Sequence, residues 1–404
     1  MNRLLILLDK SPLPDNTGSR RRLLRLIEAA SLRFEVRIGI VTTRLSAQDD
    51  GALDEGALPP SFVVPLPQSR LSPASTLRWV GGFTPPLSWA RRDLARLTDI
   101  LHNEIRTFNP HLVWTSSSSL VSTGLLDVPT PIAVDVAHLE RDAIDSQLKS
   151  VVSNLFQDRS PSRRAVVTAL DRRSRLRSEA RAFAAARLLT ACSPVEASGA
   201  ARITTARVAI VPNGVDLPAH LGWTPGSKRV LFVGNMGYEP NADAARFLVR
   251  RVLPLLRDKF KDVSVDLVGP GSAQIQELQG LRGVMIHGFI PDLSDVYRSA
   301  GLVIAPVRAG SGTKLKVLEA FAHGVPVVTT SEGISGLSVG RGSHVMLAND
   351  EHEFAQAAET LLLKHAFADQ LRVAARRWVE SDLSWPMIGQ HFCEELEQTV
   401  IGGR

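Results

Sequence analysis

The stretch from Gly310 to Thr330, GSGTKLKVLEAFAHGVPVVTT, combines small residues, two lysines and one carboxylate. It begins as a flexible loop and continues as a predicted helix, because its apolar residues recur at three- and four-residue spacing. A glycine-rich loop that opens a helix offers backbone N–H groups to an anion. We therefore predict a phosphate-binding loop, formed by Gly310, Ser311, Gly312 and Thr313.

Three charged side chains of this stretch have the chemistry to bind an activated sugar. The ammonium groups of Lys314 and Lys316 suit a diphosphate, and the carboxylate of Glu319 can accept hydrogen bonds from two sugar hydroxyls at once. The same residues also fit a purely structural role, with the lysines in solvent and Glu319 paired with a lysine. Their spacing leaves both interpretations open.

Glycines also follow other predicted strands of this half of the chain. Gly234 and Asn235 follow RVLFV, and Gly269 follows SVDLV. Because glycine lets a backbone approach a ligand closely, we assign these residues to the same binding site. The sequence lacks the G-x-G-x-x-G spacing of dinucleotide-binding proteins and the G-x-x-x-x-G-K-[ST] loop of nucleotidases. Its histidines show no metal-ligand spacing, so we predict no metal site.

Polar residues follow two predicted strands of the first half. They are Asp15, Asn16 and Gly18, in the turn-rich loop after the first strand, and Asp135, His138 and Glu140, around the end of the strand from Ile132 to Val136. In open α/β sheets, the loops at the carboxyl ends of strands face the ligand. We therefore place these residues on the acceptor side. The alternative for the first loop is a surface turn in which Asn16 or Thr17 caps the next helix.

Strands and helices alternate along both halves of the chain, which predicts parallel sheets in an α/β fold. A chain of 404 residues is too long for one ordinary core, so two doubly wound, Rossmann-like domains are expected. The segment PAHLGWTPGSK is rich in Pro and Gly and predicts a linker. The expected divisions are an N-terminal acceptor-binding domain at 1–217, the linker at 218–228, a C-terminal donor domain at 229–384 and a final helix at 385–404.

Composition restricts the class of protein further. The chain is 44% hydrophobic and 22% charged, as expected of a folded protein. Its two cysteines, Cys192 and Cys393, exclude a cysteine-based zinc site and fit a reducing cytoplasm. The net charge of +6 suits an anionic membrane or a phosphorylated substrate. With few aromatic residues and no nucleic-acid-binding motif, we expect no nucleic-acid partner. No apolar run reaches membrane-spanning length.

The motifs from Val211 to Thr330 resemble the donor domain of the retaining glycosyltransferases of family 4, which have the GT-B fold. The matching segments are VPNGVDL, VLFVGNMGYEPN, DLVGPG and IHGFIPDLSDVYRSAGLVIAPVRAGSGTKLKVLEAFAHGVPVVTT. The loop GSGTKLK is most similar to the branch that acts in exopolysaccharide assembly. The resemblance implies two Rossmann-like domains facing a cleft. It also implies that the last helix, SWPMIGQHFCEELEQTV, crosses back to the N-terminal domain.

The resemblance also implies roles for individual residues. The family marks its donor site with two glutamates at a fixed spacing; the second maps onto Glu319, which would bind donor hydroxyls, usually those of the ribose. The first maps onto Ser311. A basic pair that binds the diphosphate in relatives is absent from GNMGYEPN, which leaves Lys314 or Lys316 as the substitute. The remaining assignments are Gly288 and Phe289, in the loop that reads the base, and His138, as the histidine that contacts the transferred sugar.

A histidine that is satisfied within the fold and takes no part in catalysis is the alternative for His138. If the resemblance holds, a hexose-type sugar passes from a nucleoside-diphosphate sugar to a glycan or lipid-linked acceptor with retention, in exopolysaccharide or cell-envelope glycan synthesis. The leaving diphosphate would take the acceptor's proton, so the site needs charge stabilisation and geometry rather than a catalytic pair. No cofactor and no metal ion are expected.

The resemblance places the acceptor at the inner face of the plasma membrane, with the protein cytoplasmic or peripheral. The basic first helix and the arginines from Arg163 to Arg187 are expected to contact anionic lipid. Two other functions remain open. A sugar-nucleotide epimerase of the same fold would use carboxylates such as Asp135 and Glu140. A non-catalytic GT-B scaffold for a partner glycosyltransferase would explain Ser311 and the absent basic pair.

Overall fold

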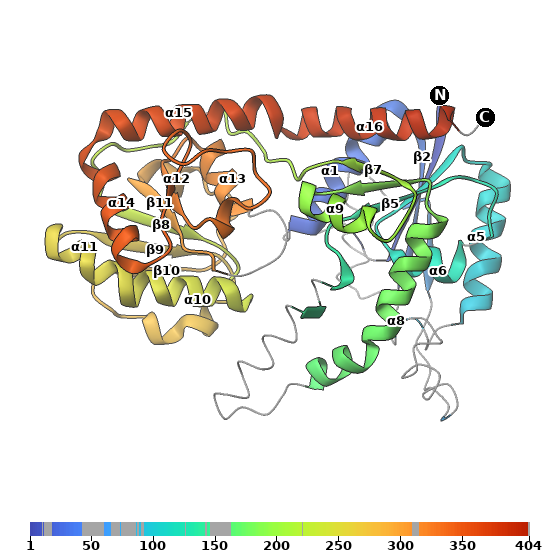
Figure 1. Cartoon of the computed structure of the whole chain (residues 1–404), viewed down its shortest axis with the longest axis horizontal. Helices are drawn as coiled ribbons and strands as arrows, with labels where there is room; N and C mark the ends of the chain where they lie inside the picture. The colour runs from blue at the N-terminus through green and yellow to red at the C-terminus, as the bar shows by residue number, and fades with distance from the viewer. Residues whose placement is uncertain are drawn as a thin grey trace. The chain divides into compact units, whose positions relative to one another are not determined.

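The computed structural model describes residues 1–9, 11, 18–42, 60–65, 73, 86, 89, 93–125, 127–141, 144–145, 163–219, 221–308 and 315–402. The chain divides into two compact units (Figure 1). Unit 1 contains Met1–Pro212 and Ile388–Arg404, and unit 2 contains Asn213–Met387. Each unit is built on a parallel sheet with helices packed against it. The predicted fold class, with two Rossmann-like α/β domains, is confirmed.

The strands described in unit 1 form one parallel sheet in the order β3-β2-β1-β4-β5-β6-β7. They are β1 (Asn2–Leu8), β2 (Phe34–Thr42), β3 (Phe62–Pro65), β4 (Leu112–Thr115), β5 (Ile132–Val136), β6 (Leu188–Ala191) and β7 (Arg207–Ile210). The central strand β1 reads NRLLILL, and the side chains from Leu4 to Leu8 are completely buried. A continuous apolar run is what a parallel strand covered on both faces requires.

The helices of unit 1 connect these strands. They are α1 (Gly18–Arg33), α5 (Leu94–Phe108), α6 (Ser118–Gly124), α8 (Arg163–Ala185) and α9 (Pro194–Ala201). Local capping fixes several of their ends: the Asp93 carboxylate accepts a hydrogen bond from the backbone N–H of Arg96 at the start of α5, and Asn109 ends that helix in a left-handed conformation. The connections therefore leave the carboxyl ends of the strands at one edge of the sheet.

The last helix, α16 (Trp385–Ile401), begins in unit 2, and its residues from Ile388 onward belong to unit 1. There the ring of Phe392 packs edge to face against Trp114 of β4, with ring centroids 5.2 Å apart. Gly389 lies against α1, and a Cβ at this position would stand 2.5 Å from the Cβ of Ala29. The C-terminal residues of the chain are thus part of the core of unit 1.

The strands described in unit 2 form a second parallel sheet in the order β10-β9-β8-β11-β12-β13. They are β8 (Arg229–Val233), β9 (Ser264–Val268), β10 (Val284–His287), β11 (Leu302–Ala305), β12 (Val327–Thr329) and β13 (Met346–Leu347). The helices are α10 (Glu239–Phe247), η1 (Leu248–Val252), α11 (Leu253–Lys259), η2 (Ser272–Leu278), α12 (Ser294–Ser299), α13 (Leu315–Ala322), η3 (Glu332–Ile334), α14 (Glu351–Leu363) and α15 (His365–Asp382). The strand order reverses between β8 and β11, the position where sheets of this kind bind ligands.

Unit 2 departs from the sequence-based expectation in three details. The single helix predicted over residues 242–260, ADAARFLVRRVLPLLRDKF, contains a π-helical turn, η1, just before Pro254, which has no N–H to continue the helical hydrogen bonds. The two-residue strand β13 is too short to leave a sequence pattern. The segment 218–228 packs within unit 2, where the indole N–H of Trp223 donates to the Gly301 carbonyl over 2.7 Å.

None of the helices in the described part of the chain is both long enough and apolar enough to cross a membrane.

Candidate functional site

Three loops of unit 2 are joined through their backbones at the carboxyl edge of its sheet. The N–H of Gly234, after β8, donates to the carbonyl of Val268 over 2.9 Å, and the N–H of Met236 donates to Pro270 over 2.7 Å. The N–H of Gly269, after β9, donates to the carbonyl of Gly288 over 3.2 Å. We call the segments 234–237, 269–271 and 288–289 the glycine edge. The structure therefore brings together Gly234, Gly269 and Gly288, as the sequence predicted.

Two glycines make this close approach of the loops possible. Gly269 has a φ of 136°, and a Cβ there would lie 2.0 Å from the carbonyl oxygen of Gly234. Gly271 has a φ of 83°, and a Cβ there would lie 2.2 Å from the backbone nitrogen of Gly237. L-residues rarely adopt such φ values and could not fit between the loops. The close contact between these loops therefore requires glycine at both positions of VGPG.

Lys316 is connected to the glycine edge through Asn241 of α10. Its ammonium group donates to the side-chain oxygen of Asn241 over 2.7 Å, and it lies 5.7 Å from the centre of the Phe232 ring. The Asn241 amide donates in turn to the carbonyl of Asn235 over 2.9 Å. The side chain of Asn235 accepts the N–H of Gly237 over 2.8 Å. The charge of Lys316 is therefore held next to the loop of Gly234 and Asn235, which was assigned to the donor site.

Glu319 lies half-buried on α13 and faces a buried aromatic side chain. The hydroxyl of Tyr297, on α12, is fully buried, and burial together with the Glu319 charge holds its pKa well above the usual value. The Tyr297 ring stacks on His323, with ring centroids 4.1 Å apart. Neither the Tyr297 hydroxyl nor Nδ1 of His323 has a hydrogen-bond partner among the described residues. Burial, and then the charge of Arg376, lowers the pKa of His323 to about 4.

The remaining predicted donor residues are either exposed or outside the described ranges. Phe289 follows Gly288 at the end of the glycine edge with 64% of its surface exposed, so its ring is accessible to a planar ligand. A Cβ at Gly288 would meet no atom within 4 Å. The residues outside the described ranges are Gly310, Ser311, Gly312, Thr313 and Lys314.

In unit 1, Asp135 lies at the end of β5 in a buried ion pair with Arg22 of α1. Nε of Arg22 donates to one carboxylate oxygen over 3.0 Å and NH2 donates to the other over 2.7 Å, and both side chains are 1% exposed. Thr190 of β6 also donates to the carboxylate over 2.8 Å. NH1 of Arg22 donates to the carbonyls of Val211 and Pro212. Asp135, predicted for the acceptor side, is thus engaged within the unit.

His138 is exposed in the short loop that follows β5. We call residues 137–141 the His138 loop. The Cys192 thiol donates to the carbonyl of Ala137 over 3.0 Å, and burial raises the pKa of that thiol to about 12. On the other side of His138, the N–H of Glu140 donates to the Glu179 carboxylate over 2.8 Å. The loop is therefore held on both sides of an accessible imidazole.

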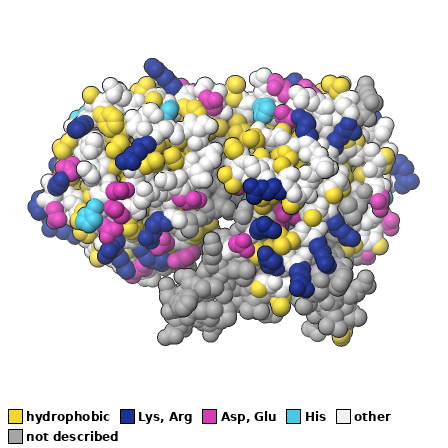
Figure 2. Space-filling view, viewed as in Figure 1, with side chains coloured by type: hydrophobic (Ala, Val, Ile, Leu, Met, Phe, Trp, Pro, Cys, Tyr) yellow, Lys and Arg dark blue, Asp and Glu magenta, His cyan; other side chains and the backbone are white. Residues whose placement is uncertain are grey.

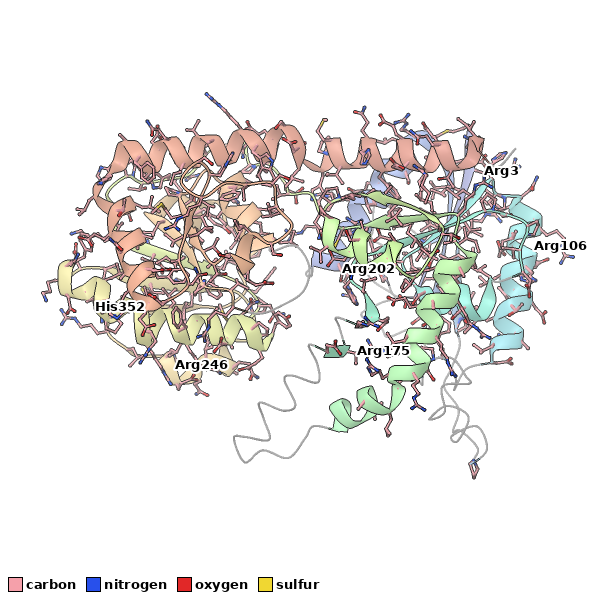
Figure 3. The ribbon with its side chains drawn as sticks, in the orientation of Figure 1. Arg3, Arg106, Arg175, Arg202, Arg246 and His352 are labelled. Atoms are coloured by element: carbon pink, nitrogen blue, oxygen red, sulfur yellow. The ribbon has the colours of Figure 1, made fainter. Side chains whose placement is uncertain are left out.

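The carboxylate of Glu140 forms an ion pair with Arg175 of α8, which Figure 3 labels on that helix. Gly18 is the first residue of α1 and is half-buried. Asp15 and Asn16 lie outside the described residues. The structure thus places Asp135, His138 and Glu140 around the end of β5, as their spacing predicted, whereas the contact of His138 with the sugar and the acceptor-side roles of Asp135 and Glu140 stay predictions.

Sequence reasoning missed four residues of these two regions. Arg22 bonds to Asp135 of β5, and Asn241 bonds both to Lys316 and to the Asn235 carbonyl after β8. Tyr297 is the buried partner of Glu319, and Arg308, after β11, donates to both carboxylate oxygens of Asp243. Three consecutive arginines in α1 give no signal that the third is buried. Arg22 and Arg308 pair with carboxylates 113 and 65 positions away, and Asn241 bonds to Lys316 75 positions away, so no local pattern reveals these contacts.

A cavity of about 420 Å³ lies apart from these residues. It is lined by Glu35, Arg37 and Phe62 near the beginnings of β2 and β3, and by Glu104 of α5, which pairs with Arg37 over 3.1 Å. We place the candidate donor site at the carboxyl edge of the sheet of unit 2 instead, where Gly234, Gly269 and Gly288 come together. Within the described ranges, no three His, Cys, Asp or Glu side chains gather as they would around a metal ion. The expectation that the reaction needs no metal ion or cofactor stays a prediction.

Comparison with known proteins identifies the region around the glycine edge. Residues 227–364 match the family described as Glycosyl transferases group 1. This segment is therefore similar to group 1 glycosyltransferases. It contains the glycine edge, Lys316 and Glu319, and it confirms the resemblance to a glycosyltransferase family.

Two curated relatives match part of the chain. The phosphatidyl-myo-inositol mannosyltransferase of Mycobacterium leprae is 26% identical over 208 residues, which cover 48% of this chain and 54% of that protein. A protein from the cps region of Klebsiella pneumoniae is 29% identical over 137 residues, which cover 31% of this chain and 35% of that protein. The matches thus span about half and about a third of the lengths of these relatives.

Solved structures resemble the chain over almost its whole length. Sucrose-phosphate synthase from Thermosynechococcus elongatus has a TM-score of 0.70 at 16% identity, with 100% of both chains covered. Anabaena HepE in complex with UDP-glucose has a TM-score of 0.63 at 16% identity, with 98% of this chain and 99% of that chain covered. At this identity the likeness concerns the fold alone. The segment 227–364 thus belongs to a chain with the GT-B fold.

Proposed function

We propose that the protein transfers a hexose-type sugar from a nucleoside-diphosphate sugar to a glycan or lipid-linked acceptor, with retention. The observation behind this proposal is the glycine edge within the segment that is similar to group 1 glycosyltransferases. Glycines in its loops let a ligand approach the backbone closely, and Lys316 is bonded to Asn241 beside them. Glu319 would accept hydrogen bonds from donor hydroxyls. HepE in complex with UDP-glucose supports the donor class.

The proposed reaction makes modest demands on the protein. The bond between the sugar carbon and the diphosphate breaks, and the acceptor oxygen bonds to the same face of that carbon. The acceptor proton passes to the leaving phosphate. The protein must therefore fix the geometry and stabilise the charge on the phosphate. The ammonium groups of Lys314 and Lys316 suit that task, with His138 contacting the transferred sugar.

We assign the reaction to exopolysaccharide or cell-envelope glycan synthesis. The relative from the cps region of Klebsiella pneumoniae and the loop GSGTKLK support this assignment. The proposed acceptor of this reaction is a growing or lipid-linked glycan. The base of the donor and the linkage formed are left to experiment.

We also propose that α8 contacts an anionic membrane surface, where a lipid-linked acceptor would lie. Arg173, Arg177 and Arg181 recur there at four-residue spacing and are exposed. Figure 2 shows Lys and Arg side chains gathered over this helix. Like charges four residues apart destabilise a helix by a few tenths of a kcal/mol per pair. An anionic surface would offset this repulsion and would add about 1 kcal/mol of attraction per arginine.

Sedimentation with liposomes tests the membrane proposal. Arg173→Glu should weaken binding to vesicles containing phosphatidylglycerol by at least fivefold, whereas Arg106→Glu, on α5, should leave it unchanged. Neutral vesicles should bind neither protein. Absence of binding to anionic vesicles at low salt would reject the membrane contact without affecting the proposed chemistry.

A panel of nucleotide sugars tests the proposed transferase activity itself. One donor should raise the melting temperature, since a ligand that binds only the folded state stabilises it by mass action. That donor should then support transfer to a glycan acceptor. Donor binding without transfer, hydrolysis or epimerisation would favour the scaffold, and formation of an epimer would favour the epimerase.

Lys314 has a distinct place in this proposal, since it was predicted to contact the diphosphate. Lys314→Ala should lower turnover by about 10²-fold, as expected for the loss of one charge-stabilising donor. Lys364→Ala, at the end of α14, is the control and should leave turnover unchanged. Steady-state kinetics at saturating donor make the comparison, and an unchanged rate in Lys314→Ala would reject the role of this side chain.

A further inference from the structure

The buried ion pair of Arg22 and Asp135 is an unusual way to hold a fold together. Two charges that leave water lose several kcal/mol of hydration each, and apolar replacements of buried pairs are often neutral or stabilising. This pair is nevertheless saturated: the guanidinium donates to both carboxylate oxygens and to two backbone carbonyls, and Thr190 donates to the same carboxylate. Such a pair offers defined geometry more than net stability.

The four segments that Arg22 connects meet at the carboxyl edge of the sheet of unit 1. Arg22 lies in the second turn of α1, Asp135 near the end of β5 and Thr190 near the end of β6. The carbonyls of Val211 and Pro212 directly follow β7. A lysine could not make these contacts, because only a planar guanidinium donates in a fork to a carboxylate while a third nitrogen reaches a carbonyl.

The His138 loop begins two residues beyond Asp135. Its Ala137 carbonyl accepts the Cys192 thiol, and the N–H of Glu140 is bonded to Glu179. The imidazole between these anchors is exposed. Asp135 fixes the direction of the backbone where the loop starts, and the other two contacts fix its course.

We propose that Arg22 is a positioning residue that, through Asp135, sets the place of the His138 loop at the carboxyl edge of unit 1. Cys192 contributes less to the position of this loop, through its hydrogen bond to the Ala137 carbonyl. The inference rests on the proposed function for the claim that His138 contacts the transferred sugar. A displacement of about 1 Å in a reacting group can lower a rate by about 10²-fold, so a small shift of the loop should be visible in turnover.

The variant Arg22→Lys tests the proposal because it keeps the charge and removes the fork. We expect kcat to fall by ten- to a hundredfold, while the dissociation constant of the donor, which is predicted to bind unit 2, changes less than twofold. Arg25→Lys is the matched control: Arg25 lies on the same helix and pairs with Glu28 over 3.0 Å. Its kcat should remain within twofold of the wild type.

A second variant covers the case in which Arg22→Lys does not fold. Cys192→Ala removes the thiol contact to Ala137 without burying a charge, and kcat should fall about threefold. Cys393→Ala, the other buried cysteine, is its control. A kcat of Cys192→Ala equal to that of Cys393→Ala, with unchanged amide exchange in the loop, would overturn the proposal.

Amide hydrogen exchange of residues 137–141 gives a readout that needs no activity. Exchange should be faster in Arg22→Lys and in Cys192→Ala and unchanged in both controls, even if the wild type transfers no sugar to any acceptor tested. Failure of the proposed function therefore appears as an inactive wild type with normal loop protection. Failure of the positioning role appears as exchange and kcat that match the controls in folded variants.

Discussion

The glycine edge of unit 2 and the His138 loop of unit 1 lie at equivalent edges of two parallel sheets, but they are held by different means. The glycine edge is held by backbone hydrogen bonds and by the absence of side chains, with Gly269 facing the carbonyl of Gly234. The His138 loop follows a buried pair of opposite charges, Arg22 and Asp135. The first arrangement fails when an atom is added, and the second fails when a charge loses its partner.

The largest loss of stability is expected from a variant that leaves a buried charge without its ionic partner. Asp135→Ala should lower the free energy of unfolding by about 3–5 kcal/mol, because Arg22 would remain buried without its carboxylate. Asp262→Ala is the control: Asp262 pairs with Lys228 over 2.8 Å at the surface, and such solvent-screened pairs contribute little to stability. Urea denaturation of both variants measures the difference. Equal losses in the two variants would contradict the importance given to the buried pair.

A smaller loss is expected when an atom is added to the glycine edge. Gly269→Ala places a methyl group against the Gly234 carbonyl in a strained backbone region, and we expect a loss of roughly 2–3 kcal/mol. Gly288→Ala adds a methyl group to open space and should leave stability within about 0.5 kcal/mol of the wild type. Thermal denaturation compares the two, and a fully stable Gly269→Ala protein would show that the loops can separate at little cost.

In unit 2, the half-buried His323, which stacks on Tyr297 beside Glu319, makes stability depend on pH. His323 has a pKa of about 4 in the fold against 6.5 for an ordinary histidine. The unfolded chain therefore binds this proton first, and stability falls as the pH drops from 6.5 towards 4, by about 1–2 kcal/mol. His323→Phe keeps the stacking on Tyr297 and should remove this part of the pH dependence.

The exposed His352 on α14, which Figure 3 labels, provides the control for this titration. His352→Gln should retain the fall in stability between pH 6.5 and 4. Urea denaturation at several pH values makes the measurement. If His323→Phe loses stability over this interval as steeply as His352→Gln, another group accounts for the acid sensitivity.

The two regions also differ in how far the sequence predicted them. The glycine edge could be predicted because each loop directly follows an apolar strand, and parallel strands bring their carboxyl ends to one edge. The ion pair of unit 1 could not, since its two residues are 113 positions apart and Arg22 stands in a row of arginines that looks like a solvent-exposed face. The proximity of Tyr297 to Glu319 could not be predicted either, because no residue near Tyr297 in sequence indicates it.

The central claim is that the glycine edge and Glu319 bind a nucleoside-diphosphate sugar. Isothermal titration of the full chain with UDP-, GDP- and ADP-sugars tests it most directly, with wild type, Glu319→Ala and the control Glu332→Ala measured side by side. We predict that one donor binds the wild type with a defined affinity, that Glu319→Ala weakens it about tenfold or more, equivalent to about 1.4 kcal/mol, and that Glu332→Ala does not. Equal affinity in all three proteins, or no donor bound by the wild type, would contradict the claim.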